Sequence, residues 1–227
     1  KTHGMHLIRR IAVPAGEDEE GNTNSWLWFE RPGNADDEGS QSACKPIAWP
    51  VHTEDVSRNA SQIVHALGLP NELQEAVVLA AQFHDLGKKR DLWQRHIGNP
   101  NPKNWLAKSG GTMKPVELTD YRHEFGSLLD VQNEPAFLKL CDEMKDLMLH
   151  LIAAHHGRGR PHFPPDEAFD TEPKGRDTHT ITIEVCQRFG RLQRKYGRWR
   201  LAYLESLLRA ADWAASALPS AFVEGTS

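Results

Sequence analysis

Cysteine is scarce in this chain. Only Cys44, Cys141 and Cys186 occur among 227 residues, and no two of them form a C-x-x-C pair. An odd number of widely spaced cysteines argues against a disulfide framework and against a zinc knuckle. We therefore expect the protein to work in a reducing compartment, the cytoplasm.

Long apolar runs and an excess of positive charge are also missing. No segment resembles a transmembrane helix, and none has the charged and apolar regions of a secretory signal. The formal net charge is −4, so any surface that binds a polyanion must be local. These absences predict a protein without a membrane partner.

Histidine, in contrast, is frequent, with 12 copies, which is the first compositional hint of metal chemistry. Hydrophobic residues make up 39% of the chain. Over this length, that share is enough for one sizeable core and a small appendage.

The first 50 residues differ from the rest. Residues 7–13 and 25–30 are expected to form the two strands of a β-hairpin around an acidic turn, and residues 31–45 a loop rich in Gly, Asp and Ser. From residue 51 onward the apolar spacing is helical. We therefore divide the chain into an extension, residues 1–50, and an all-α domain, residues 51–227.

Glycine and proline mark the ends of the expected helices. One helix is expected to end at Gly68, and a second is expected to follow it and to end at Gly87. One long helix is expected to follow Pro135 and to stop at Gly157. Irregular stretches are expected at residues 98–119 and 158–178. The other expected helices cover residues 91–97, 121–131, 180–196 and 199–217.

Four of these helices carry a metal-ligand type of side chain at one end of the apolar stripe. The residues are His52, His84, His155 with His156 next to it, and Asp212. Burying such groups costs several kcal/mol unless each finds a partner, and a shared cation would satisfy them together. Imidazole and carboxylate ligands suit a transition metal better than an all-oxygen magnesium site.

Each of these residues has a simpler explanation when taken alone. His52 is then a core histidine bonded to a carbonyl, and Asp212 is a helix N-cap or part of a buried salt bridge. The segment around His84 and Asp85, Phe-His-Asp-Leu-Gly-Lys, is far more specific. The conjunction of all these groups along one helical chain favours a metal site.

The order His, His-Asp, His, His-His, Asp resembles the HD-domain metal-dependent phosphohydrolase superfamily. One branch is especially similar, the HD nuclease of type I CRISPR interference, which accompanies a superfamily 2 helicase. The matching pieces are His52, residues 83–88 (FHDLGK), Trp93-Gln94, residues 122–124 (RHE), residues 154–157 (AHHG) and residues 211–216 (ADWAAS). The resemblance implies an HD helical bundle with the hairpin and loop as an appendage.

The resemblance also implies two metal ions. The first would be held by His52, His84, Asp85 and Asp212. The second would be held by Asp85, His123, His155 and His156, so that Asp85 bridges the two. The expected ions are divalent manganese, iron, cobalt or nickel, with weaker support from magnesium. Two such ions would bind the phosphate and activate water.

Lys88 lies three residues after Asp85 and would neutralise charge on the reacting phosphate. Its simpler explanation is a solvated lysine at a helix C-terminus. Asp85 and Lys88 are thus the candidate catalytic residues.

Single-stranded DNA is the expected substrate, supplied by the helicase, which is either fused to this chain or separate, within a CRISPR surveillance complex. Two basic regions are candidate contacts, one with Arg158 and Arg160, the other with Arg194 and Arg198 among aromatic residues. For the second region, a solvated helix face is the alternative.

Three functions remain open from the sequence. The first is the metal-dependent DNA nuclease. The second is an HD phosphohydrolase that acts on nucleotides or cyclic nucleotides. The third is a non-enzymatic, metal-stabilised docking module.

Overall fold

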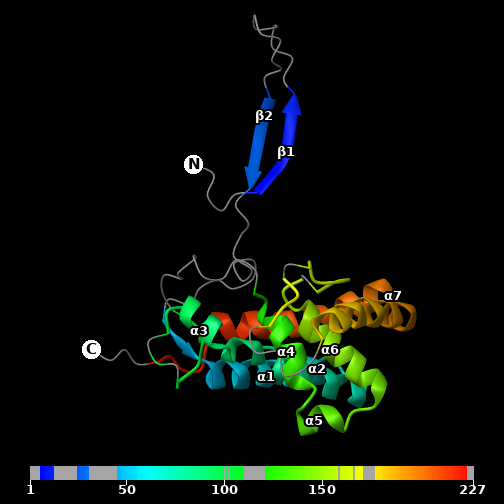
Figure 1. Cartoon of the computed structure of the whole chain (residues 1–227). Helices are drawn as coiled ribbons and strands as arrows, with labels where there is room; N and C mark the ends of the chain where they lie inside the picture. The colour runs from blue at the N-terminus through cyan, green and yellow to red at the C-terminus, as the bar shows by residue number, and fades with distance from the viewer. Residues whose placement is uncertain are drawn as a thin grey trace, which may run out of the picture.

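The structure is a computed structural model of the 227-residue chain. It describes residues 6–12, 25–30, 45–99, 101, 103–109, 121–157, 159–165, 167–170 and 177–223. In this part the protein is mostly helical with a short antiparallel hairpin near its N-terminus (Figure 1), which confirms the predicted fold class.

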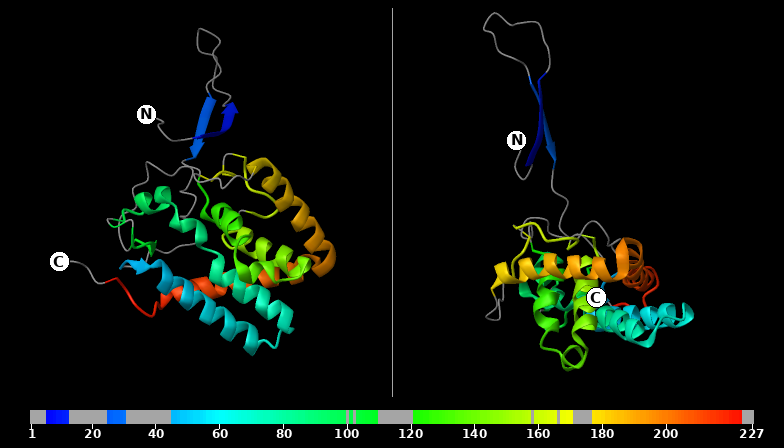
Figure 2. Two further views of the ribbon diagram at one scale, coloured as in Figure 1. Left: turned by 60° about the horizontal axis from the view of Figure 1, so that its bottom comes forward. Right: turned by 90° about the vertical axis from the view of Figure 1, so that its right-hand side faces the viewer.

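Four long helices form the body of the domain. They are α1 (Trp49–Ala66), α2 (Asn71–Phe83), α6 (Asp142–Ala154) and α7 (Thr178–Ala217). Helix α1 packs against α2 and α7, and α6 packs against the same two helices (Figure 2). Their inward stripes meet in one apolar core, which includes Val56, Val77, Leu147 and Leu208 at full burial. Burial of these stripes drives the assembly, because most of the stability of helices in proteins comes from packing of their apolar faces.

Four shorter elements are packed around this body. They are the 3₁₀ helix η1 (Leu86–Lys89), α3 (Asp91–His96), α4 (His123–Val131) and α5 (Pro135–Leu138). Helix α4 lies so close to η1 that a Cβ atom on Gly87 would come within 2.0 Å of the His123 carbonyl oxygen. The Gly87 amide donates to Ser127 Oγ at 2.8 Å, and the Tyr121 hydroxyl donates to the Gly87 carbonyl at 2.8 Å. Glycine is therefore required where η1 meets α4.

Two small sheets complete the fold. Strands β1 (His6–Ala12) and β2 (Ser25–Glu30) form the antiparallel hairpin, which Figures 1 and 2 show apart from the helices. The predicted hairpin is thus confirmed. Strand β3 (Ile47–Ala48) pairs with β4 (Leu106–Lys108) beside the start of α1. The predicted division of the chain at residue 50 stays a prediction.

The expectation of one long helix after Pro135 is wrong. The chain breaks between α5 and α6, where Cys141 has extended backbone angles. The buried residues Phe137, Leu140 and Met144 keep a spacing of three and four across the break. The apolar spacing therefore predicts one continuous helix, although the helical backbone is interrupted at Cys141.

One other expectation differs in detail from the structure, and one is confirmed. The stretch 98–119, expected to be irregular, contains β4, which is too short to show a strand pattern. The predicted separation of the last two helices is confirmed, because the backbone of α7 is non-helical at Gly197, whose φ of 72° is favourable for glycine. Within the described part of the chain, every helix is too short or too polar to span a lipid bilayer.

Candidate metal centre

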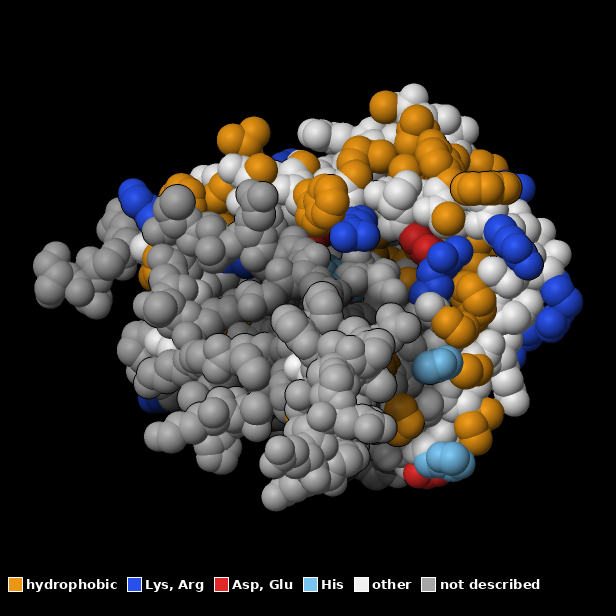
Figure 3. Space-filling view, turned by 90° about the horizontal axis from the view of Figure 1, so that it is seen from above, with side chains coloured by type: hydrophobic (Ala, Val, Ile, Leu, Met, Phe, Trp, Pro, Cys, Tyr) orange, Lys and Arg blue, Asp and Glu red, His pale blue; other side chains and the backbone are white. Residues whose placement is uncertain are grey.

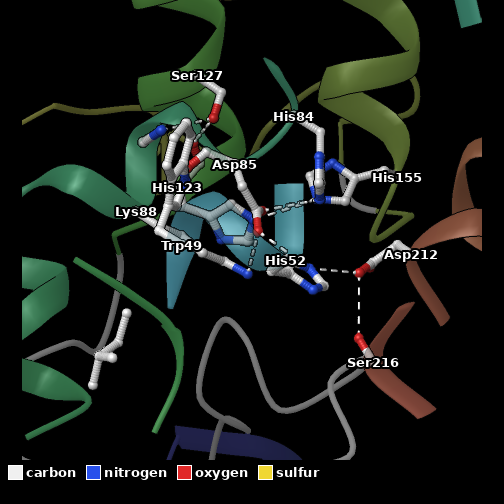
Figure 4. A network of polar contacts seen from close by, with 12 residues as sticks. Trp49, His52, His84, Asp85, Lys88, His123, Ser127, His155, Asp212 and Ser216 are labelled. Atoms are coloured by element: carbon white, nitrogen blue, oxygen red, sulfur yellow. Dashed lines mark hydrogen bonds and ion pairs between the residues drawn. The ribbon is translucent and has the colours of Figure 1, made fainter. Parts of the chain in front are cut away.

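The predicted ligands come from five separate parts of the fold and converge on one place (Figure 4). His52 lies in the first turn of α1, and Asp212 lies on α7. His84 and Asp85 follow α2, His123 opens α4, and His155 and His156 follow α6. All are buried except His156, which is partly exposed.

Asp85 is at the centre of this cluster. Its Oδ1 atom lies 3.4 Å from His84 Nε2, 3.2 Å from His123 Nε2 and 4.0 Å from His155 Nε2. Its Oδ2 atom lies 3.6 Å from His52 Nε2. Oδ1 thus faces three imidazoles, and Oδ2 faces a fourth, that of His52.

The remaining ligand candidates lie on two sides of this cluster. His52 Nε2 lies 3.0 Å from Asp212 Oδ1, which brings α1 and α7 together at the site. On the other side, His123 Nε2 lies 3.3 Å from His155 Nε2. The ligand atoms of His123, His155 and His156 all lie within 4.8 Å of one another, as do those of His52, His84 and Asp85. The structure therefore brings all seven predicted ligands together.

Backbone carbonyls fix the tautomers of two of the imidazoles. His84 Nδ1 lies 2.8 Å from the Ala81 carbonyl oxygen, and His155 Nδ1 lies 2.7 Å from that of Ile152. A carbonyl can only accept, so each Nδ1 carries the hydrogen and each Nε2 presents its lone pair to the centre. Metal-binding histidines are typically held in this way.

The donor set fits a bound cation. Nε2 of His84 and Oδ1 of Asp85 are buried, and neither makes a well-formed hydrogen bond with another described residue. Leaving such groups unsatisfied costs about 1–3 kcal/mol each. Ligands about 2.1 Å from one ion are separated by about 3.0–3.4 Å. Several of the distances above fall in or near this range.

The electrostatics of the site favour the protonation states that bind metals. Burial lowers the pKa of His84, and it lowers the pKa of His155 and His156 well below 6.5. Burial acts to raise the pKa of Asp85, but the neighbouring His84, the Lys88 ammonium and the contact with His123 hold it well below its usual range. The lowered pKa values favour neutral imidazoles at His84, His155 and His156 and an ionised carboxylate at Asp85.

Asp212 is held in its ionised form in the same way. Burial acts to raise its pKa, while the contact with His52 and the charge of Lys108 keep it well below 3.8. Lys108 is a buried residue of β4 that our sequence analysis missed. No spacing could reveal it, because it lies in a stretch that looked irregular.

Lys88 and Trp49 hold Asp85 from two sides. The buried Lys88 ammonium lies 2.9 Å from Asp85 Oδ2. The Trp49 indole Nε1 donates to the Asp85 main-chain oxygen at 2.8 Å. Trp49 was also missed, although it precedes His52 by three residues and so lies on the same face of α1.

Behind the site, a buried arginine anchors the segment that carries Asp85. Arg90 donates two hydrogen bonds to Asp130, of 2.7 and 3.1 Å, and two to Asp170, of 2.8 and 2.6 Å. Gln94 donates to the carbonyls of Lys88 and Leu106 at 2.7 and 3.0 Å. These bonds tie η1 to α4 and β4.

Of the four residues predicted to contact nucleic acid, the three that the structure describes form none of the contacts given above for the metal centre. Arg160 is partly buried and donates to Glu205 at 2.9 Å. Arg194 and Arg198 are exposed on α7. Arg158 lies outside the described residues. Seen from above, described Lys and Arg side chains are scattered among hydrophobic ones rather than gathered in one patch (Figure 3).

A helical bundle that buries a His-Asp centre defines an HD-type metal-dependent hydrolase. The family model described as Cas3, HD domain matches residues 43–220, so the chain belongs to that family. It is therefore a CRISPR-associated, metal-dependent nuclease domain. No curated protein and no solved structure matches the chain.

Proposed function

We propose that this domain hydrolyses phosphodiester bonds in single-stranded DNA that a superfamily 2 helicase, fused or separate, delivers from a CRISPR surveillance complex. The observation that carries the proposal is the placement of Asp85. Its Oδ1 atom faces the imidazoles of His84, His123 and His155, and its Oδ2 atom faces His52 and the Lys88 ammonium. Family membership supports a nuclease.

His52, His84, Asp85 and Asp212 would hold one ion, and Asp85, His123, His155 and His156 a second. When bound, two divalent ions supply Lewis acidity and lower the pKa of a water molecule. The nitrogen-rich donor set favours manganese, iron, cobalt or nickel over magnesium.

The chain's own residues contribute charge and exclusion of water. Lys88 is buried next to Asp85 and can turn its ammonium toward a phosphate oxygen. In a buried site, such a charge stabilises a phosphate more than it would in water. The imidazoles of His84, His155 and His156, whose pKa values burial lowers, need not release a proton before they bind a metal.

For the path of the strand, Arg194 and Arg198 stay our proposed contacts, because both are exposed. Arg158 and Arg160 follow the metal-binding His155-His156 pair in the chain, and we keep them as candidates. The ion pair of Arg160 with Glu205 would have to open for that residue to take part.

The test is a cleavage assay with end-labelled single-stranded and double-stranded DNA in manganese, cobalt, nickel and magnesium. Asp85→Asn should abolish cleavage of the single strand, while His65→Gln, at an exposed histidine of α1, should leave it unchanged. Equal cleavage by Asp85→Asn would contradict the proposal. Release of phosphate from nucleotides without strand cleavage would favour the nucleotide phosphohydrolase instead. Bound metal without any hydrolysis would favour a docking module.

A further inference from the structure

Trp49, Trp105 and Lys89 form a cluster beside the metal centre. The proposed function assigns this cluster no contact with the substrate. The Lys89 ammonium lies 3.8 Å from the ring centroid of Trp49 and 4.8 Å from that of Trp105. The two indoles meet edge to face with centroids 6.4 Å apart. The Trp49 amide donates to the Trp105 carbonyl at 2.8 Å, which fixes the two backbones together.

This cluster lies next to Asp85 and Lys88, the proposed catalytic residues. The Trp49 indole donates to the Asp85 main-chain oxygen, and Lys89 follows Lys88 in η1 (Figure 4 shows Trp49 beside Asp85 and Lys88). Trp105 immediately precedes β4, which ends at the buried Lys108. A nucleotide next to a phosphate held at Asp85 would therefore be near these rings.

The two indole rings differ in how much of their surface a ligand could contact. Trp49 is partly buried, and its N–H is used to hold Asp85. Trp105 has 38% of its surface exposed, although the next three residues, those of β4, are buried. A large aromatic side chain held rigidly and left partly exposed presents a flat apolar surface to a ligand.

We propose that Trp105, supported by Trp49 and Lys89, is a stacking subsite for a nucleobase next to the scissile phosphate. This inference rests on the proposed function and specifies how its site would hold the strand. Base–aromatic stacking tolerates any sequence, since every base has a flat face. The Lys89 ammonium adds positive charge where the neighbouring phosphate would lie. A base within a duplex is stacked on its neighbours, so the subsite selects single strands.

The experiment compares two fluorescent probes, an oligothymidine and a strand of the same length whose bases are replaced by the abasic tetrahydrofuran analogue. Both carry the same phosphates, so they differ only in the presence of the bases. Binding is measured by fluorescence anisotropy in manganese with Asp85→Asn protein, which prevents cleavage. In this background we compare Trp105→Leu, Trp105→Phe and Tyr203→Leu. Tyr203 is a comparably exposed aromatic residue of α7, at 43%.

The parent protein and Tyr203→Leu should bind oligothymidine about 5- to 100-fold more tightly than the abasic strand, as expected for one stacked base. Trp105→Leu should remove this preference and leave abasic binding unchanged, and Trp105→Phe should restore most of it. If Trp105→Leu weakens binding of both strands equally, the residue is only structural and the inference is wrong. It is also wrong if the variant weakens neither.

The same set separates this inference from the proposed function. If protein with Asp85 intact cuts neither strand while the base-dependent binding disappears in Trp105→Leu, the nuclease proposal fails and the subsite stands. If the chain cuts single-stranded DNA and Trp105→Leu keeps the full preference for bases, the subsite fails and the nuclease stands.

Discussion

His52 Nε2, in the first turn of α1, lies 3.0 Å from Asp212 Oδ1, near the end of α7. The first and last helices of the domain thus meet at the metal centre. A cation held by this pair would link the two ends of the fold and stabilise it, because it binds the folded chain only.

The two groups of ligands should be separable by mutation. His52→Gln removes a ligand of one proposed ion and His156→Gln a ligand of the other, so each variant should retain close to half of the manganese bound by the unmodified chain. Elemental analysis after removal of unbound metal measures this content. Unchanged metal in both variants would contradict the assignment, and His65→Gln is the control.

Lys88→Met should slow cleavage without removing metal. The substitution removes the buried ammonium 2.9 Å from Asp85 and preserves most of the side-chain volume. We expect kcat to fall about 100-fold, as for the loss of one charge-stabilising donor. Single-turnover cleavage measures the effect, and Lys145→Met, at an exposed pair with Asp142, should change nothing. A rate like that of the unmodified chain would assign Lys88 a structural role.

Arg90 is predicted to matter for stability more than for chemistry. Arg90→Met leaves the carboxylates of Asp130 and Asp170 without their buried partner and should lower the free energy of unfolding by about 3–5 kcal/mol. Arg191→Met removes a similar two-bond pair with Asp146 that is exposed, and should cost less than about 1 kcal/mol. Urea unfolding of the two variants compares them, and equal losses would refute the prediction.

The metal-free protein should lose stability in mild acid. The pKa values of His84, His155 and His156 are lowered from 6.5, so the unfolded chain binds more protons than the folded chain just below that pH. Their contribution is fully present above pH 6.5 and is lost as the pH falls below it. The melting temperature in chelator should therefore drop between pH 7.5 and 5.5. The drop should be smaller in a His155→Gln, His156→Gln protein, and a flat profile would contradict the assignment.

Much of the metal centre could be predicted from the sequence, because several of its ligands lie at the end of the apolar stripe of a helix. His52 and Asp212 each extend a run of buried residues at helical spacing, and the structure places both at the shared end of α1 and α7. Apolar spacing did not indicate His123; only the resemblance of residues 122–124 to a family motif predicted it as a ligand. Its approach to Asp85 depends on the close packing of η1 against α4 at Gly87.

Other features depend on contacts distant in sequence, which spacing does not encode. Trp105 joins Trp49 through the pairing of β3 with β4, and neither two- nor three-residue strand has a recognisable pattern. The break before α6 was missed because the apolar spacing continues across it. The ion pair of Arg160 with Glu205 likewise appears only once α7 is packed in place.

The central claim is that Asp85 bridges two metal ions. Anomalous diffraction from crystals grown in manganese tests it most directly. The account predicts two anomalous peaks, one on each side of the Asp85 carboxylate, with His52 and Asp212 beside one and His123, His155 and His156 beside the other. A single peak, or two peaks of which only one contacts Asp85, would contradict it.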